Sequence, residues 1–72
     1  MAGAEELKVY ALGGRRVVFV GAGQAEGLRV HLGSCGFPAG VVRTPGSDLD
    51  RLELERHTDV GAAQAALDRW PG

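Results

Sequence analysis

Apolar residues recur at strand-like and helix-like spacings along most of the chain. Two segments rich in β-branched and aromatic residues, 7–12 and 15–20, flank the dipeptide Gly13-Gly14. A two-residue turn of type I′ needs a positive φ at both central positions, which glycine adopts readily. The pattern therefore predicts a β-hairpin at the start of the chain.

The next segment has the spacing of a helix. Its apolar residues lie three, four and three positions apart on one face: Ala25, Leu28, Leu32 and Cys35. Gly36 stands where the left-handed conformation ends a helix, Phe37 follows as its hydrophobic contact, and Pro38 prevents continuation. We predict a helix from about residue 24 to 35. Because two internal glycines each cost about 1 kcal/mol relative to alanine, this helix depends on tertiary packing.

A second hairpin and a second helix follow. Residues 40–43 form a β-branched strand, and Thr44–Ser47 fits a type II turn with Pro and Gly at its centre. Residues 51–56 alternate strictly, which predicts a strand with one buried and one wet face. The leucines at 52 and 54 fall on one face, and the other face carries Arg51, Glu53 and Glu55.

The second helix is rich in alanine and has a clear start signal. Thr58 or Asp59 is suited to the N-cap, and Pro71-Gly72 ends the helix. Its apolar stripe again has spacings of three, four and three: Val60, Ala63, Leu67 and Trp70.

The resulting order is β-β-α-β-β-α, which predicts an α+β fold. We expect a two-layer sandwich in which a four-stranded antiparallel sheet, ordered one-two-four-three, carries both helices on one face. This order is also that of a ferredoxin-like circular permutant, with the last strand moved to the front. A chain of 72 residues is expected to form a single small domain over residues 1–72, with residues 1–6 flexible.

Charge and composition exclude several classes of partner. Eight basic and nine acidic residues give a net charge of −1, which provides no field for nucleic acid. The acidic start MAGAEELK is unlike a signal peptide, and the longest apolar run, Val17 to Val20, cannot span a membrane. We expect a cytoplasmic protein that binds neither nucleic acid nor membrane. One cysteine cannot form an intramolecular disulfide.

The segment Val17–Gly27 is the most suggestive for ligand binding. A strand, a glycine loop and a helix follow one another, an order that resembles the dinucleotide-binding fingerprint. The spacing is GxGxxxG rather than GxGxxG, Glu26 stands at the third-glycine position, and the chain is too short for a dinucleotide-binding domain. A tight connection between strand and helix explains the same glycines. The alternative function is a regulatory domain that binds a small phosphate-bearing anion through Gly21, Gly23, Gln24, Ala25 and Arg43.

No group of side chains predicts catalysis or metal binding. His31 and Cys35 are four residues apart on the first helix, a spacing that suits two ligands of one metal ion. A third ligand would have to be His57, and Cys35 lies on the apolar stripe, where cysteine acts as a small hydrophobic residue. We therefore assign no catalytic residue, no metal and no cofactor, and expect that the protein is not an enzyme.

The open face of the sheet is the favoured site of interaction. If Val18 and Val20 face the helices, Val17 and Phe19 lie on the other face, and Tyr10 can join them. Trp70 is expected to anchor the core or to contribute to an interface. Such a patch predicts a protein partner, and a domain this small gains stability by oligomerisation. The sequence thus favours a non-catalytic protein-interaction module that forms a homodimer through Tyr10, Val17, Phe19 and Trp70.

Overall fold

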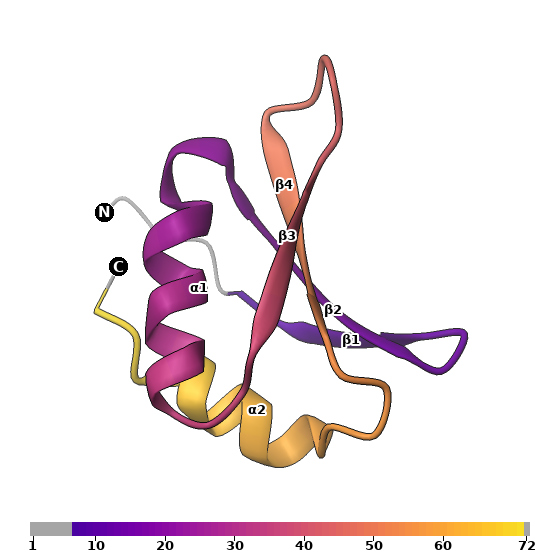
Figure 1. The fold of residues 1–72 in the computed structure, drawn as a ribbon, viewed down its shortest axis with the longest axis vertical. Coiled ribbons are helices and arrows are strands. Elements are labelled where there is room, and N and C mark those ends of the chain that lie inside the picture. Colours follow the sequence, from indigo (N-terminus) through magenta and orange to yellow (C-terminus); the bar gives the residue numbers. More distant parts are fainter. Residues whose placement is uncertain (1–6, 72) are drawn as a thin grey trace.

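The computed structural model describes residues 7–71, which form one sheet and two helices (Figure 1). The expected flexibility of residues 1–6 lies outside the described residues. The elements in chain order are β1 (Val9–Leu12), β2 (Arg15–Gly21), a short 3₁₀ turn η1 (Ala22–Gln24), α1 (Ala25–Ser34), β3 (Ala39–Arg43), β4 (Leu49–Leu54) and α2 (Val60–Asp68). None of the helices in this part of the chain has the length and apolar character needed to cross a membrane.

The four strands form one antiparallel sheet in the order β1-β2-β4-β3. Both helices lie on the same side of this sheet, α1 along β3 and β4 and α2 near β1 (Figure 1). The prediction of an α+β domain with a four-stranded antiparallel sheet and two helices is therefore confirmed.

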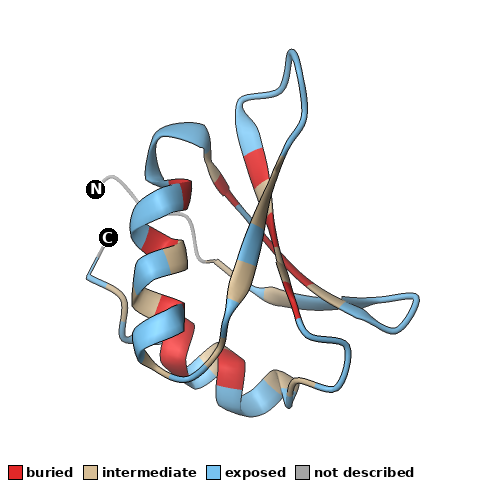
Figure 2. Cartoon of the chain, in the orientation of Figure 1, coloured by how far each residue is buried: buried red, intermediate tan, exposed pale blue. Residues whose placement is uncertain are grey.

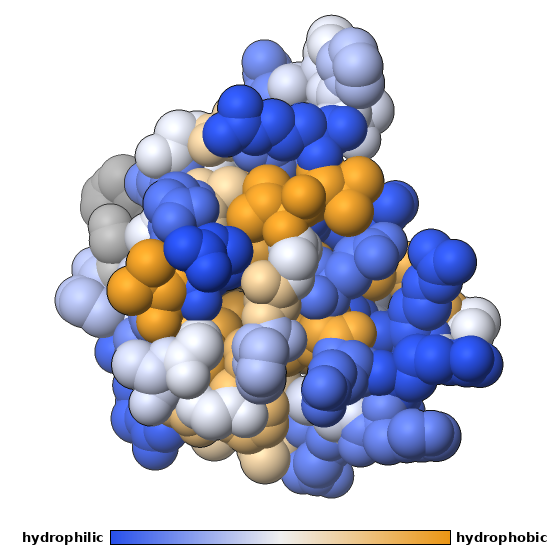
Figure 3. All heavy atoms as spheres, viewed as in Figure 1, coloured by the Kyte–Doolittle hydropathy of each residue, from blue (hydrophilic) through white to orange (hydrophobic). Residues whose placement is uncertain are grey.

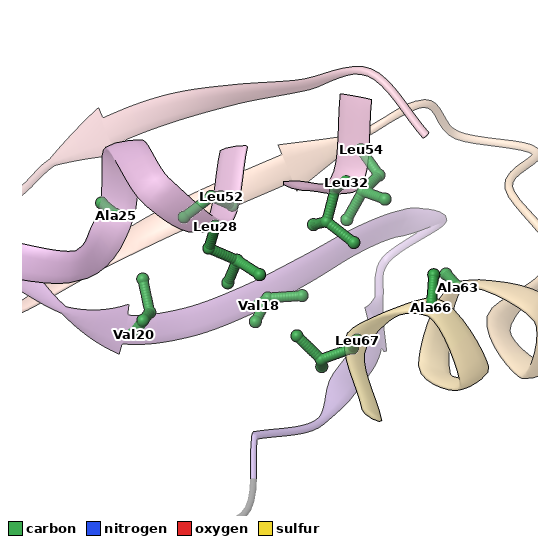
Figure 4. Close-up of a cluster of buried hydrophobic side chains, with 10 residues drawn as sticks. All are labelled: Val18, Val20, Ala25, Leu28, Leu32, Leu52, Leu54, Ala63, Ala66 and Leu67. Carbon is green, nitrogen blue, oxygen red and sulfur yellow. The ribbon is translucent and has the colours of Figure 1, made fainter. Parts of the chain in front are cut away.

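A single apolar cluster joins the two layers. Buried side chains from β2 and β4 meet those of the helices, as Figure 4 shows, and the red segments of Figure 2 mark where these buried residues lie on each element. The largest fully buried members are Leu28, Leu32, Leu52, Val18 and Val20. Burying a side chain of this size contributes about 1.5–3 kcal/mol, so this cluster is the main source of stability.

The turns follow the local sequence signals. Gly13 and Gly14 have φ values of 56° and 84°, as a type I′ hairpin turn requires. Gly46 has a φ of 79°, and the amide of Ser47 donates to the carbonyl of Thr44 at 3.1 Å. These values match the third position and the closing hydrogen bond of the predicted type II turn.

The helix ends also follow their signals. The Phe37 amide donates to the Leu32 carbonyl at 2.8 Å and the Gly36 amide to the Gly33 carbonyl at 3.1 Å. This pair of bonds is the Schellman motif, with Gly36 at a φ of 90° and Phe37 packed against the core. The side chain of Asp59 caps α2 by accepting a hydrogen bond from the amide of Ala62 at 2.8 Å.

Two strands, the first and the fourth, differ from their predicted ranges by two residues, whereas the second and third are each one residue longer than predicted. The fourth strand was predicted at 51–56 but spans 49–54, because β2 continues to Gly21 and pairs there with Leu49. Glu55 accordingly lies in the turn before α2 and not on the open face. The first strand begins at Val9 rather than at position 7, since its pairing with β2 starts at Val9 and Val18.

Candidate functional site

The face of the sheet opposite the helices is the candidate functional site, here called the open face. On β2 the side chains of Val18 and Val20 belong to the core, so Val17 and Phe19 point the other way. Strand register extends this face to Tyr10 on β1 and Arg51 on β4.

Large apolar side chains are concentrated on the open face. Four residues within the described part are exposed there: Tyr10 (45%), Leu12 (51%), Phe19 (39%) and Leu49 (43%). Val30, at 56% and on the outer side of α1, is the fifth exposed large hydrophobic residue of residues 7–71. Four of the five thus share one surface, which is typical of an interaction site.

Three of these side chains form a connected group around Val17. Tyr10 lies opposite Val17 in the β1–β2 register, and its ring is 6.1 Å from the ring of Phe19, tilted by 57°. Leu49 is a diagonal neighbour of Phe19 across β2 and β4. Val17 itself is 2% exposed, so it supports the two rings rather than offering a contact surface.

The centre of the open face carries charges of both signs. The Glu53 carboxylate forms an ion pair with Arg51 Nη2 at 3.0 Å and accepts a hydrogen bond from Arg15 Nη1 at 3.5 Å. The Nε of Arg51 is buried and has no hydrogen-bond partner among the described residues. The face therefore combines apolar side chains with a small network of two positive charges and one negative charge.

Trp70 lies away from the open face. It follows α2 and packs, half-buried, against the core on the helix side of the sheet. A Cβ built on Gly27 of α1 would lie 3.7 Å from Cζ2 of the Trp70 ring. Gly27 of α1 therefore faces the ring of Trp70, at an ordinary van der Waals distance. Of the predicted interface residues, the structure brings Tyr10, Val17 and Phe19 together and separates Trp70 from them.

The glycine loop is a compact turn with few free donors. Its first amide, on Ala22, is already bound by the Asp48 carbonyl at 3.1 Å, and Ala25 is buried in the core. Gly21 and Gly23 have no positive φ, and a Cβ at either position would meet no neighbour within 4 Å. The two glycines are required neither by the backbone conformation nor by the packing of this structure.

Two carboxylates lie near the same loop, and each is paired with an arginine. Glu26 in the first turn of α1 accepts hydrogen bonds from Arg29, which lower the pKa of the Glu26 carboxyl, and the charge of Arg43 acts in the same direction. Arg43 is exposed, and its Nε lies 3.9 Å from the buried carboxylate of Asp50. The predicted anion-binding residues thus share their surroundings with two carboxylates, which oppose the binding of a phosphate.

The pair of His31 and Cys35 is held by backbone contacts. The Nε2 of His31 lies 2.8 Å from the carbonyl of Ala66 and 3.8 Å from Sγ of Cys35. A hydrogen bond to a carbonyl requires a proton on Nε2, so this nitrogen cannot act as a base toward the thiol. Within residues 7–71 no three histidine, cysteine or acidic side chains are grouped as a metal site would require.

The sequence alone did not point to two residues of the open face. Leu12 ends β1 beside the hairpin turn, and Leu49 lay outside the predicted fourth strand. Leu52 and Leu54 face the core, so in a strand extended back to residue 49 the alternation places Leu49 on the opposite, open face.

No protein-family model matches the chain, and neither a curated protein nor a solved structure matches it.

Proposed function

We propose that this chain is a non-catalytic protein-interaction module that self-associates through the open face of its sheet. The observation that carries the proposal is the concentration of Tyr10, Leu12, Phe19 and Leu49 on that face. Aromatic residues are enriched where protein surfaces meet, because they bury large areas at a small entropic cost.

The charges of the open face suit a second copy of the same chain. A two-fold contact places the same surface on both sides, so a face with one sign of charge would repel itself. Here Glu53 lies between Arg15 and Arg51, and each of these arginines can approach the Glu53 of a partner. The aromatic pair then contributes buried area beside this network.

The size of the open face predicts a weak dimer. Four strands about 4.8 Å apart and a longest strand of about 23 Å give a projected area of roughly 400 Å². A standard interface buries about 800 Å² of accessible surface on each partner. We therefore expect association in the range of tens to hundreds of micromolar, which is about 5–6 kcal/mol.

Sedimentation equilibrium from about 10 µM to 1 mM tests this proposal with a matched pair of variants. Phe19→Thr removes an aromatic ring from the open face and keeps strand propensity, whereas Val30→Thr removes apolar surface from the outer side of α1. Phe19→Thr should weaken the dimer at least tenfold, and Val30→Thr should leave it unchanged. A wild-type chain that stays monomeric at high micromolar concentration would refute the proposal.

We also interpret the fold as a ferredoxin-like arrangement in permuted order. If β1 were moved from the front to the end of the chain, the order would become β-α-β-β-α-β. The neighbourhood of α2 and β1 supports this interpretation, because those two elements would then be consecutive.

A further inference from the structure

The two edges of the sheet differ in how their outer backbone groups are bound. At the β1 edge, the side-chain amide of Gln64 accepts from the Val9 amide at 2.9 Å and donates to the Leu7 carbonyl at 3.1 Å. These two bonds reproduce the pairing of a neighbouring strand. The start of the β1 edge is therefore covered by α2, which is one way in which proteins prevent edge-to-edge association.

The same hydrogen bond shows which backbone groups of β3 point outward. Because the Val9 amide points away from β2, Val9 and Val18 are a non-hydrogen-bonded pair. Hydrogen-bonded and non-hydrogen-bonded pairs alternate along an antiparallel ladder, so the amides of successive residues point to opposite sides of their strand. Carried through the register of β2 with β4 and of β4 with β3, this alternation directs the amides of Gly40 and Val42 toward β4. The two-residue turn at Gly13-Gly14 leads to the same assignment.

Three residues of β3 consequently present their amides and carbonyls to the outside: Ala39, Val41 and Arg43. No hydrogen bond from another described residue reaches these groups. None of the three is a proline, so every amide is available as a donor. In Figure 3 apolar surface lies over the middle of β3, between hydrophilic side chains above it and to its right.

We propose that β3 pairs with β3 of a second copy of this chain, antiparallel and centred on Val41. In this register Val41 faces Val41 of the partner subunit, and Ala39 faces Arg43 of the partner subunit at each end. All three of these pairs join outward-pointing groups, and each such pair exchanges two hydrogen bonds. Two four-stranded sheets would thereby become one continuous sheet.

The composition of β3 suits pairing with itself better than pairing with an unrelated peptide. Its single charge, on Arg43, stands at one end, so the two arginines of an antiparallel pair lie far apart and do not repel. Val42 lies opposite Gly40 of the partner subunit, which leaves room for the branched side chain. The Val41 pair adds a β-branched contact across the two-fold axis.

Amide hydrogen exchange, followed by NMR at rising protein concentration, tests this register directly. The amides of Ala39, Val41 and Arg43 should exchange rapidly in dilute protein and at least tenfold more slowly near 1 mM. The amides of Gly40 and Val42, bound to β4, should be protected at every concentration and serve as internal controls.

A pair of variants at one position gives the second measurement. Arg43→Pro removes an outward amide and places a ring against the partner strand, whereas Arg43→Ala keeps the amide and removes only the exposed side chain. Two hydrogen bonds per dimer are lost in Arg43→Pro, which should weaken association by roughly ten- to a hundredfold, while Arg43→Ala should associate like wild type.

The edge contact is independent of the open face, and the experiments separate the two. Dimerisation lost in Phe19→Thr, with no change in exchange at the three outward amides, would support the open face and overturn the edge contact. Dimerisation lost in Arg43→Pro, with concentration-dependent protection of those amides, would support the edge contact whatever Phe19→Thr does. A monomer with unprotected amides at 1 mM overturns the edge contact, as does protection that appears only when another strand-forming peptide is added.

Discussion

Replacing Gln64 with alanine tests how much the covering of the β1 edge contributes to stability. The change removes the bonds to the Val9 amide and the Leu7 carbonyl, both partly buried, and an exposed bond to Asp68 at 2.9 Å. A typical hydrogen bond contributes about 0.5–1.5 kcal/mol net, and the exposed one adds little. We therefore expect a loss of about 1–3 kcal/mol. For a domain of this size that corresponds to a fall in Tm of roughly 4–20 °C.

The chain offers a matched control for this experiment. Gln24, the only other glutamine, is exposed at the N-cap of α1 and makes no side-chain capping bond, so Gln24→Ala should change the free energy of unfolding little. Urea denaturation of the two variants gives the comparison, and exchange of the Val9 amide should accelerate only in Gln64→Ala. Equal stability of the two variants would show that the Gln64 bonds contribute nothing and would remove the contrast between the two sheet edges.

Three further changes test the backbone, the charges and the glycine loop. Gly36→Ala should lower the free energy of unfolding by about 1–2 kcal/mol, because residue 36 has a positive φ. Gly33→Ala lies in a helix with open space around it and should raise the free energy of unfolding by about 0.5–1 kcal/mol. Urea denaturation measures both changes. The hydrogen bonds from Arg29 lower the pKa of Glu26, so Glu26→Gln should be less stable than wild type at neutral pH. The difference in stability between wild type and Glu26→Gln should vanish as the pH falls from 4.5 through the lowered pKa of Glu26. Thermal unfolding of both proteins across this range measures it, and a difference that does not change with pH would contradict the prediction. Phosphate or nucleotides at millimolar concentration should leave the melting temperature unchanged, because the arginines near the loop, Arg29 and Arg43, are already paired with carboxylates. A rise in the melting temperature would restore the anion-binding alternative.

The features predicted correctly from the sequence are those encoded within a few residues. The turn at Gly13-Gly14 and the Schellman motif at Gly36 depend on the positive φ that glycine tolerates. The cap at Asp59 depends on an oxygen three residues before a free amide. The residues that make up each of these features lie within about six positions of one another, so the local sequence is sufficient to predict them.

The features that the sequence did not indicate depend on residues far apart in the chain. Gln64 binds backbone atoms 55 and 57 positions earlier, and no local pattern distinguishes such a residue. Its position as one polar residue in the alanine-rich run 62–66 was the available signal, because an exposed helix face usually carries several polar residues. The start of β4 was missed for the same reason, since the length of β2 determines it.

The arrangement of α2 links the two proposed contacts. Gln64 of α2 covers the edge of β1, and this leaves Tyr10 of that strand to present its ring on the open face beside Phe19. No corresponding side chain of the described residues reaches β3, whose outward groups remain unbound. The start of one edge and one face of the sheet are thus covered within the chain, and the opposite edge and face are not. Because a 72-residue domain has only a small core, association at either remaining surface would add stability that the monomer cannot supply alone. Stability that rises with protein concentration is therefore expected in wild type, and its loss in Arg43→Pro or in Phe19→Thr identifies which surface supplies it.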